Sequence, residues 1–374
     1  MDILLFVILV LFAVATFFQL LYSIIIYGRF SFVRKKDAVT DNIKHPVSVV
    51  ICARNEYNNL EKNLHLVLEQ DYPNFEVVVV NDYSDDDSTF LLEQMQKKYS
   101  NLRVVTLSQQ LNFFKGKKFP LSIGIKAAKN EILLLTDADC YPNSNQWINN
   151  MQRHFDDNTD VVLGYGGYKS DKGLLNKIIQ FDTMKIAIQY FSMALFGRAY
   201  MGVGRNLAYR KSVFYKYGGF TEHYKISSGD DDLFINKVSN KKNTKIECSV
   251  DSFTISEPKK SFSLWCRQKK RHLSTGKYYK FVFKAVLGLN TISLFTLYIS
   301  FTFLVINATG ILLYSVIVGF AAVLIMQLLV YYFGFNKLNN KKQWLLAPLF
   351  EIFFVIFNPL FYLANSFNKQ NKWK

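Results

Sequence analysis

The sequence predicts an α/β domain that is held between membrane-spanning helices. Two observations predict it. Apolar stretches without charged residues stand near both ends of the 374-residue chain, and the part between them has mixed polarity. In that middle part, β-branched runs alternate with segments that have helical apolar spacing, which is typical of a parallel sheet covered on both faces. We therefore expect an anchor over residues 1–27, an α/β domain over 28–280, and a membrane region of two or three segments over 281–374.

The first apolar stretch predicts an uncleaved anchor. It runs from Ile3 to Tyr27 without a charged residue, and at 1.5 Å per residue a helix of this length crosses roughly 30 Å of hydrocarbon. A cleaved signal peptide is the alternative, because Ala13-Val14-Ala15 resembles a cleavage site. However, no basic residue precedes the stretch, and it continues well past Ala15. Basic residues follow it, which predicts a cytosolic C-terminal end.

The C-terminal part predicts two spans and a third apolar segment of open topology. Residues 285–336 carry no charge, and the turn-forming residues 307–310 divide them into two helices joined by a tight hairpin. Residues 344–364 are also apolar, but Glu351 and Asn358-Pro359 interrupt them. A third span would place the basic tail outside, against the positive-inside rule, whereas a re-entrant or interfacial segment would keep it inside. Both alternatives stay open.

The charge balance favours a membrane surface over a nucleic acid as partner. The chain has 45 Lys and Arg against 29 Asp and Glu, a formal net charge of +16. Much of this excess flanks the apolar stretches, at Arg29, Arg34, Lys35, Lys36, Lys277, Lys280, Lys284, Lys337, Lys341 and Lys342. That placement suits anionic lipid headgroups, and we expect no nucleic-acid partner.

The α/β domain begins with four predicted strands, over residues 47–52, 77–80, 103–107 and 132–136. Helical spacing over residues 60–68 and 90–99 places a helix after each of the first two. Polar residues follow three of the strands, as Arg54-Asn55-Glu56, Asn81-Asp82 and Asp137-Ala138-Asp139. In such sheets ligands bind beyond the carboxyl ends of the strands, so these residues predict a site at that edge.

Asp137-Ala138-Asp139 is the most informative of these motifs. Two carboxylates one residue apart, just past a buried strand, can share a hard cation such as Mg²⁺ or Mn²⁺. Phosphatases of the haloacid-dehalogenase type also place Asp-x-Asp after a strand, but a Thr or Val follows soon after, where this chain has Cys140-Tyr141. The acidic run 85–87 is interpreted as a solvated loop that caps a helix at Asp87 or Ser88.

Three later segments carry further candidates. The basic residues 115–118 form either a surface loop or a cation site for a diphosphate. Asp230-Asp231-Asp232 precede an apolar helix start; they are either a helix N-terminal charge cluster or, since crowding raises a carboxyl pKa, the source of a general base. Residues 263–280, which contain Gln268 and Arg271, predict an amphipathic interfacial helix.

Taken in order, residues 46–275 resemble the family 2 inverting glycosyltransferases with a GT-A fold, in their membrane-anchored bacterial form. Residues 47–59 are similar to the opening strand and its nucleotide-contacting loop, and Asn81-Asp82-Tyr83-Ser84 resembles Asp-Asp-Gly-Ser with two departures. Gly116-Lys117 is similar to the Gly-Lys before the metal motif, and Asp137-Ala138-Asp139 matches Asp-x-Asp. Residues 202–210 resemble the acceptor-side segment, and Gly229-Asp230-Asp231 resembles Gly-Glu-Asp. Gln268-x-x-Arg271 resembles Gln-x-x-Arg-Trp, with His272 replacing Trp.

This resemblance implies a Rossmann-like nucleotide-diphospho-sugar transferase domain and a set of site residues. The nucleotide-sugar would be bound by Ala53, Arg54, Glu56, Asp82, Lys117 and Asp137. Asp137 and Asp139 would hold the divalent cation, Mg²⁺ or Mn²⁺. Asp231 would be the catalytic base, with Asp230 as the alternative one position earlier. Gln268, Arg271 and His272 would close over the diphosphate or position the acceptor.

The function implied is transfer of a sugar, with inversion, from a nucleotide-sugar (UDP-linked by preference) to a lipid or lipid-linked glycan in cell-envelope or polysaccharide biosynthesis. The enzyme would be a multi-pass protein of the inner or plasma membrane with its catalytic domain in the cytoplasm. Two alternatives come from other classes. One is a metal-dependent hydrolase of nucleotide-sugars or phosphate esters, and the other is a non-catalytic basic membrane scaffold.

Overall fold

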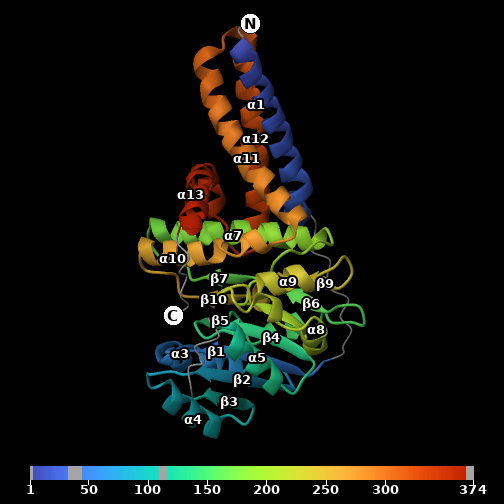
Figure 1. The fold of residues 1–374 in the computed structure, drawn as a ribbon, viewed down its shortest axis with the longest axis vertical. Coiled ribbons are helices and arrows are strands. Elements are labelled where there is room, and N and C mark those ends of the chain that lie inside the picture. Colours follow the sequence, from blue (N-terminus) through green and yellow to red (C-terminus); the bar gives the residue numbers. More distant parts are fainter. Residues whose placement is uncertain (1–2, 33–43, 109–115, 368–374) are drawn as a thin grey trace.

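The computed structural model describes residues 3–32, 44–108 and 116–367. Figure 1 shows three levels along the long axis: an α/β part at one end, two helices lying across the middle, and a bundle of long helices at the other end. Several of the predicted basic residues, Arg34, Lys35, Lys36 and Lys115 among them, lie outside the described residues.

The main sheet has seven strands in the order β3-β2-β1-β4-β8-β6-β9. They are β1 (Val47–Ala53), β2 (Phe75–Asp82), β3 (Leu102–Leu107), β4 (Ile132–Asp137), β6 (Val161–Leu163), β8 (Leu207–Arg210) and β9 (Thr244–Ile246). The four predicted strands, β1 to β4, are parallel as expected, but β8 runs antiparallel to both β4 and β6. The prediction of a parallel sheet is therefore correct only for its first half, because apolar periodicity indicates burial and not strand direction.

Helices cover both faces of the parallel half. They are α3 (Tyr57–Leu68), α4 (Ser88–Lys98), α5 (Lys118–Ala127) and the short α6 (Trp147–Gln152). Strand β1 shows why both faces need cover: successive side chains point to opposite faces, and every side chain of β1 is buried. Val49 packs in the core that contains Leu64 of α3, whereas Val50 packs in the core that contains Ile125 of α5.

A second, three-stranded sheet lies beside the first, in the order β5-β10-β7. Its strands are β5 (Cys140–Pro142), β7 (Gly166–Tyr168) and β10 (Thr254–Ser256). Close packing against a side chain explains Gly164, which precedes β7. A Cβ atom on Gly164 would lie only 2.4 Å from Cγ of Asn206, and the Asn206 amide bonds Tyr165 O and Ser252 O. The chain at Gly164 thus passes close against the Asn206 side chain.

Two helices form the middle level in Figure 1, α7 (Leu174–Leu195) and α10 (Phe262–Leu273). The predicted amphipathic helix ends at Leu273 and is followed by the 3₁₀ turn η4 (Gly276–Tyr278). Phe181 of α7 is fully buried among aromatic rings of the bundle, including those of Tyr331 and Phe354. This packing joins the α/β part to the long helices. Shorter elements complete this region: α8 (Lys211–Lys216), η2 (Thr221–His223), α9 (Asp232–Val238) and η3 (Val250–Ser252).

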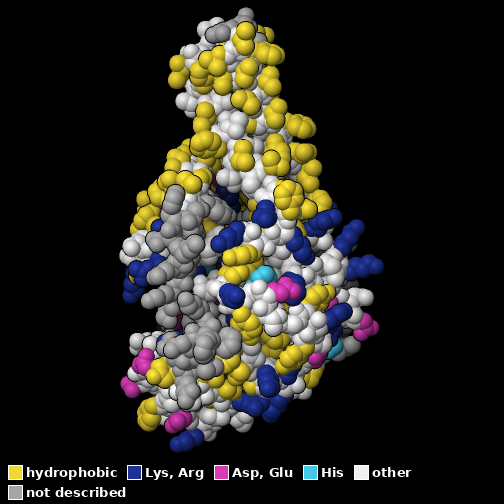
Figure 2. All heavy atoms as spheres, viewed as in Figure 1, with side chains coloured by type: hydrophobic (Ala, Val, Ile, Leu, Met, Phe, Trp, Pro, Cys, Tyr) yellow, Lys and Arg dark blue, Asp and Glu magenta, His cyan; other side chains and the backbone are white. Residues whose placement is uncertain are grey.

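The bundle contains the predicted spans. The anchor helix α1 (Ile3–Tyr22) continues through a π-helical stretch, η1 (Ser23–Tyr27), into α2 (Gly28–Ser31), and α11 (Phe281–Asn307) and α12 (Gly310–Lys337) form the predicted hairpin. All three are long and apolar enough to cross a membrane. Figure 2 shows hydrophobic side chains over the visible surface of this bundle and Lys and Arg side chains below it.

The third apolar segment is helical, as η5 (Gln343–Leu346) and α13 (Ala347–Phe367), with Pro359 inside the helix. Residues 343–361 are also long and apolar enough to cross a membrane. In Figure 1, α13 lies next to α10, with which it is in contact, and it also contacts the long helices α11 and α12.

Candidate active site

The carboxyl ends of β1, β2 and β4 meet at one edge of the sheet. In the strand register Asp137 lies beside Cys52, and Asn81 lies beside Ala53. A cavity of about 1030 Å³ lies over this edge and extends to α7, α10 and α11. Among the predicted site residues, those that line it are Arg54, Glu56, Lys117, Asp137, Asp139, Asp230, Asp231, Gln268, Arg271 and His272. The fold therefore brings residues from distant parts of the sequence to one space.

Asp137 and Asp139 lie close together beside a buried lysine. Ligand atoms of Asp137, Asp139 and Cys140 all lie within 4.8 Å of one another. Burial opposes ionisation of Asp137, but the ion pair with the Lys117 ammonium outweighs it and lowers the pKa of this carboxyl. Burial, and then the Asp137 charge, raise the pKa of Asp139.

Two carboxylates held this close repel one another unless a cation lies between them, and their oxygens are the ligands that Mg²⁺ and Mn²⁺ prefer. Cys140 does not complete such a site. Its Sγ lies 2.8 Å from Oγ of Ser256, and burial raises the pKa of the thiol well above its usual value. Asp137 and Asp139 are thus the residues that fit a divalent cation.

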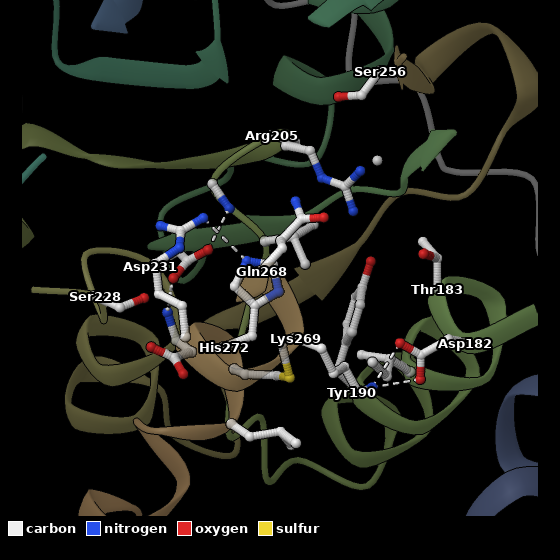
Figure 3. A pocket seen from close by; sticks show the side chains of 18 of the residues that line it. Asp182, Thr183, Tyr190, Arg205, Ser228, Asp231, Ser256, Gln268, Lys269 and His272 are labelled. Carbon is white, nitrogen blue, oxygen red and sulfur yellow. Dashed lines mark hydrogen bonds and ion pairs between the residues drawn. The ribbon is translucent and has the colours of Figure 1, made fainter. Parts of the chain in front are cut away.

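The three consecutive carboxylates Asp230, Asp231 and Asp232, called here the acidic triplet, have different surroundings. Oδ2 of Asp231 accepts a hydrogen bond of 2.8 Å from the Gly204 N–H, and Oδ1 accepts one of 2.7 Å from the Asp232 N–H. Burial and the neighbouring charges of Asp230 and Asp232 raise the pKa of Asp231 to about 7. Figure 3 shows the Asp231 carboxylate at the cavity wall, on the side of His272 and Gln268. A carboxyl with this pKa can accept a proton near neutral pH.

Asp232 has a structural environment. Its side chain is buried and accepts hydrogen bonds from the hydroxyls of Thr275 and Tyr279 and from the Leu233 N–H. These bonds fasten the start of α9 to the segment that follows α10. Asp230 lines the cavity beside Asp231. The two hypotheses for the triplet therefore apply to different members: Asp232 stabilises the fold, and Asp231 faces the cavity.

The basic residues 116–118 do not form a surface loop. Lys117 and Lys118 are both buried, and Nζ of Lys118 donates to the carbonyl oxygens of His223, Ile226 and Ser228 at 2.7, 2.9 and 2.7 Å. Three donors and three acceptors satisfy this ammonium completely. Its partners lie in the loop just before Gly229, so Lys118 ties the start of α5 to the loop that carries the acidic triplet. Sequence analysis missed this role because the acceptors are backbone atoms.

Arg205 is a further site residue that sequence analysis did not single out. Its guanidinium lies over the Tyr168 ring, 4.4 Å from the ring centroid, and it lines the cavity. The hydroxyls of Thr136 and Thr254 both donate to the Arg205 carbonyl oxygen at 2.9 Å. The residue follows Gly204, inside the segment 202–210 that resembled the acceptor side, and this was its only signal in the sequence.

Gln268, Arg271 and His272, all on α10, line the cavity. Nε2 of Gln268 donates to the Tyr168 hydroxyl at 3.1 Å. Desolvation and the nearby Arg271 guanidinium lower the pKa of His272 well below its usual value, so this imidazole stays neutral. Figure 3 shows Gln268 and His272 directed towards the space between Asp231 and Arg205.

Two predicted site residues lie elsewhere. Ala53 is completely buried within β1, and Asp82 ends β2; neither is among the lining residues of the cavity. Burial raises the pKa of Asp82, and Arg54 partly offsets this rise. In the run 85–87, the helix begins at Ser88 with Asp87 at the N-cap position, but Asp86 is the residue whose carboxylate accepts from the Ser88 N–H. Asp87 is therefore the N-cap residue, as expected, although its side chain makes no capping hydrogen bond.

Comparisons with known proteins agree with this geometry. Residues 48–218 match the model of glycosyl transferase family 2. The probable glycosyltransferase YdaM of Bacillus subtilis is 27% identical over 247 residues, which are 62% of this chain and 55% of that protein. The UDP-Glc:alpha-D-GlcNAc-diphosphoundecaprenol beta-1,3-glucosyltransferase WfaP of Escherichia coli is 26% identical over 129 residues, 34% of this chain and 47% of that protein. The matched part thus spans about half the length of these relatives.

A solved structure shows the same fold over almost the whole chain. The mannosyltransferase PcManGT from Pyrobaculum calidifontis, in complex with GDP-Man and Mn²⁺, superposes with a TM-score of 0.57 at 17% identity. The superposition covers 93% of this chain and 99% of that one. Residues 48–218, from β1 to α8, thus match the glycosyl transferase family 2 domain, and the superposition shows that the α/β domain has the GT-A fold.

Proposed function

We propose that this protein is a membrane-bound glycosyltransferase that moves a sugar from a nucleotide-sugar to a lipid or lipid-linked glycan, with inversion at the anomeric carbon. One observation carries the proposal. A single cavity contains a carboxylate pair suited to a divalent cation, buried cations suited to a diphosphate, and a carboxyl whose pKa is near neutrality. Each of these groups performs a different part of glycosyl transfer.

The donor occupies the edge of the sheet. Arg54 and Glu56 lie where β1 ends and contact the nucleoside, while Lys117 and Arg205 face the diphosphate. Asp137 and Asp139 would hold a divalent cation, which would neutralise charge on the leaving diphosphate. A UDP-linked donor is preferred because the name of the E. coli relative specifies UDP-glucose. GDP-mannose, the ligand of the structural neighbour, is the alternative to include in any test.

Asp231 acts as the base. An acceptor hydroxyl is a weak nucleophile at neutral pH, so its oxygen attacks the anomeric carbon as its proton passes to the Asp231 carboxylate. The new C–O bond forms on the face opposite the bond to the diphosphate, which breaks and releases the nucleoside diphosphate. The Gly204 N–H holds Asp231 Oδ2, which fixes the direction of the carboxylate. Oδ1 also accepts from the Asp232 N–H, so both oxygens are oriented by backbone donors.

The acceptor enters the cavity from the side of the membrane helices. Three of them and the helix pair α7 and α10 lie on the side of the cavity opposite the sheet. The E. coli relative is named for a diphosphoundecaprenol-linked acceptor, which supports a lipid-linked substrate here. The positions of Lys280, Lys284 and Lys337 at the ends of α11 and α12 support a cytoplasmic catalytic domain by the positive-inside rule.

The test is a donor screen on the purified full-length protein in nanodiscs that contain lipids of the producing cell. UDP- and GDP-linked sugars are supplied with Mg²⁺ or Mn²⁺, and radiolabel in the lipid fraction is measured. We expect label from one donor class, dependent on the cation and absent in Asp231→Asn. Release of free sugar without labelled lipid would indicate a hydrolase instead. Failure of every donor to bind would contradict the catalytic proposal as a whole.

A further inference from the structure

The cavity has a second end among the membrane helices. Beyond the reaction centre, the same cavity is lined by residues of η1, α7, α11 and α13, namely Tyr27, Lys185, Gln189, Asn290, Thr291 and Asn358. We call this end the helix-side chamber. Three of its four elements belong to helices that are long and apolar enough to cross a membrane. A molecule that reaches Asp231 through this chamber therefore passes between lipid-facing helices and is itself amphipathic.

The charges that border the helix-side chamber are neutralised within the protein. Nζ of Lys269 on α10 lies 2.5 and 2.6 Å from the two carboxylate oxygens of Asp182 on α7, and Figure 3 shows this pair across the cavity from Asp231. Nζ of Lys185 lies 2.7 Å from Oε2 of Glu351 on α13. Each ammonium thus has a carboxylate partner of its own, so neither is available as a strong site for a phosphate.

What remains at the chamber wall is neutral hydrogen-bonding chemistry, from the amides and hydroxyls of Gln189, Asn290, Thr291 and Asn358. One of these groups lacks a partner. Oδ1 of Asn358 is buried and accepts no hydrogen bond from the described residues. A buried amide oxygen without a donor is costly, and a phosphate without a hydrogen cannot supply one. A hydroxyl group can supply such a donor.

We propose that the helix-side chamber binds the acceptor, and that the acceptor is an amphipath whose headgroup is uncharged and rich in hydroxyls, such as a glycosylated or glycerol-type lipid. The inference rests on the proposed function, because it places this headgroup in line with Asp231. The lipid chains lie between the membrane helices, and a headgroup hydroxyl reaches the base. Arg205, whose guanidinium lies over the Tyr168 ring at the other end of the cavity, remains available for the donor diphosphate, whereas Lys117 is already paired with Asp137.

The test is equilibrium binding of a tritiated long-chain alkyl glucoside to the full-length protein in nanodiscs, without any nucleotide-sugar. We expect saturable binding that Asn358→Leu weakens at least tenfold. Removing an unpartnered buried amide should leave the melting temperature unchanged or raise it, so lost binding does not report unfolding. Ile356→Leu, at an exposed position of the same helix, is the matched control and should bind like wild type.

Competition with a polyprenyl phosphate distinguishes the anionic alternative. We expect weak competition, and no loss of glucoside binding in Arg267→Gln, which removes an exposed cation at the cavity rim. Strong competition by the phosphate, together with loss in Arg267→Gln, would overturn the proposal, as would unchanged glucoside binding in Asn358→Leu. Binding of UDP and GDP is measured on the same samples. If neither UDP nor GDP binds, the proposed transferase activity is contradicted. The glucoside-binding result still tests the helix-side chamber separately.

Discussion

The backbone N–H of Gly204 donates a 2.8 Å hydrogen bond to Oδ2 of Asp231. This bond joins the loop before β8 to the loop before α9, two segments that are 27 positions apart in the chain. It leaves the carboxylate oriented at the cavity wall, where the crowding of Asp230 and Asp232 and its burial keep the pKa near 7. The arrangement gives each residue of the triplet a separate, testable role.

Asp231→Asn should abolish transfer and leave donor binding intact. Removing a positioned general base costs about 10²–10⁴ in rate, whereas the donor uses groups at the other side of the cavity. Turnover with the donor found in the screen, and calorimetric titration with UDP or GDP, measure the two effects. Loss of turnover in Asp230→Asn with activity kept in Asp231→Asn would show that the base lies one position earlier.

Asp232→Asn should chiefly destabilise the fold. The Asp232 carboxylate accepts from Thr275, Tyr279 and the Leu233 N–H inside the protein. An amide replaces one accepting oxygen by a donor, and a mispaired buried group costs about 1–3 kcal/mol. Thermal unfolding should therefore occur at a lower temperature, with part of the activity retained below that temperature. A melting temperature equal to that of Asp231→Asn would contradict the structural role.

The rate should rise with pH through about 7. Asp231 accepts a proton only when ionised, and its pKa of about 7 leaves it mostly protonated at pH 6 and mostly ionised at pH 8. Asp230→Asn removes one of the charges that raise this pKa, so the midpoint of the profile should move to lower pH. kcat/KM for the acceptor, measured from pH 5 to 9, reports the midpoint. A profile that is flat over this range would exclude Asp231 as the base.

Asp139→Asn should weaken cation binding and transfer together. Asp137 and Asp139 supply the two carboxylates of the site, and a lost carboxylate ligand worth a few kcal/mol corresponds to roughly a hundredfold or more in rate. Activity against Mn²⁺ concentration should shift to higher concentrations, and chelator should abolish the wild-type reaction. Full activity of the variant, or of the wild type in excess chelator, would show that Asp-x-Asp is structural.

Lys118→Met should lower turnover by displacing the loop that carries Asp231. The change leaves three buried carbonyl oxygens without their donor, at about 1 kcal/mol or more each. We expect a lower melting temperature, a reduced kcat and a donor KM close to wild type, since Lys117 stays in place. Lys126→Met, exposed on the same helix, is the control and should change neither. An equal loss of donor affinity would argue for a direct contact between Lys118 and the diphosphate.

Much of the architecture follows from the sequence alone. Uninterrupted apolar stretches define the helices α1, α11 and α12, because their length and lack of charge determine where a chain can meet hydrocarbon. The β-branched runs define β1 to β4, and the acidic residues at the end of β4 indicate the proposed cation site. These features are local, so a one-dimensional pattern contains them.

The tertiary structure decided the remaining features of the site, because these features depend on contacts between segments that are distant in the sequence. The direction of β8, the three backbone acceptors of Lys118 and the place of Arg205 beside Asp-x-Asp have no local sequence signal. The acidic triplet is the clearest case. Three identical side chains cannot be told apart in sequence, but packing buries Asp232 against Thr275 and leaves Asp231 at the cavity, held by Gly204. Burial and hydrogen-bond partners, which only the folded chain supplies, determine which carboxyl is structural and which can take up a proton.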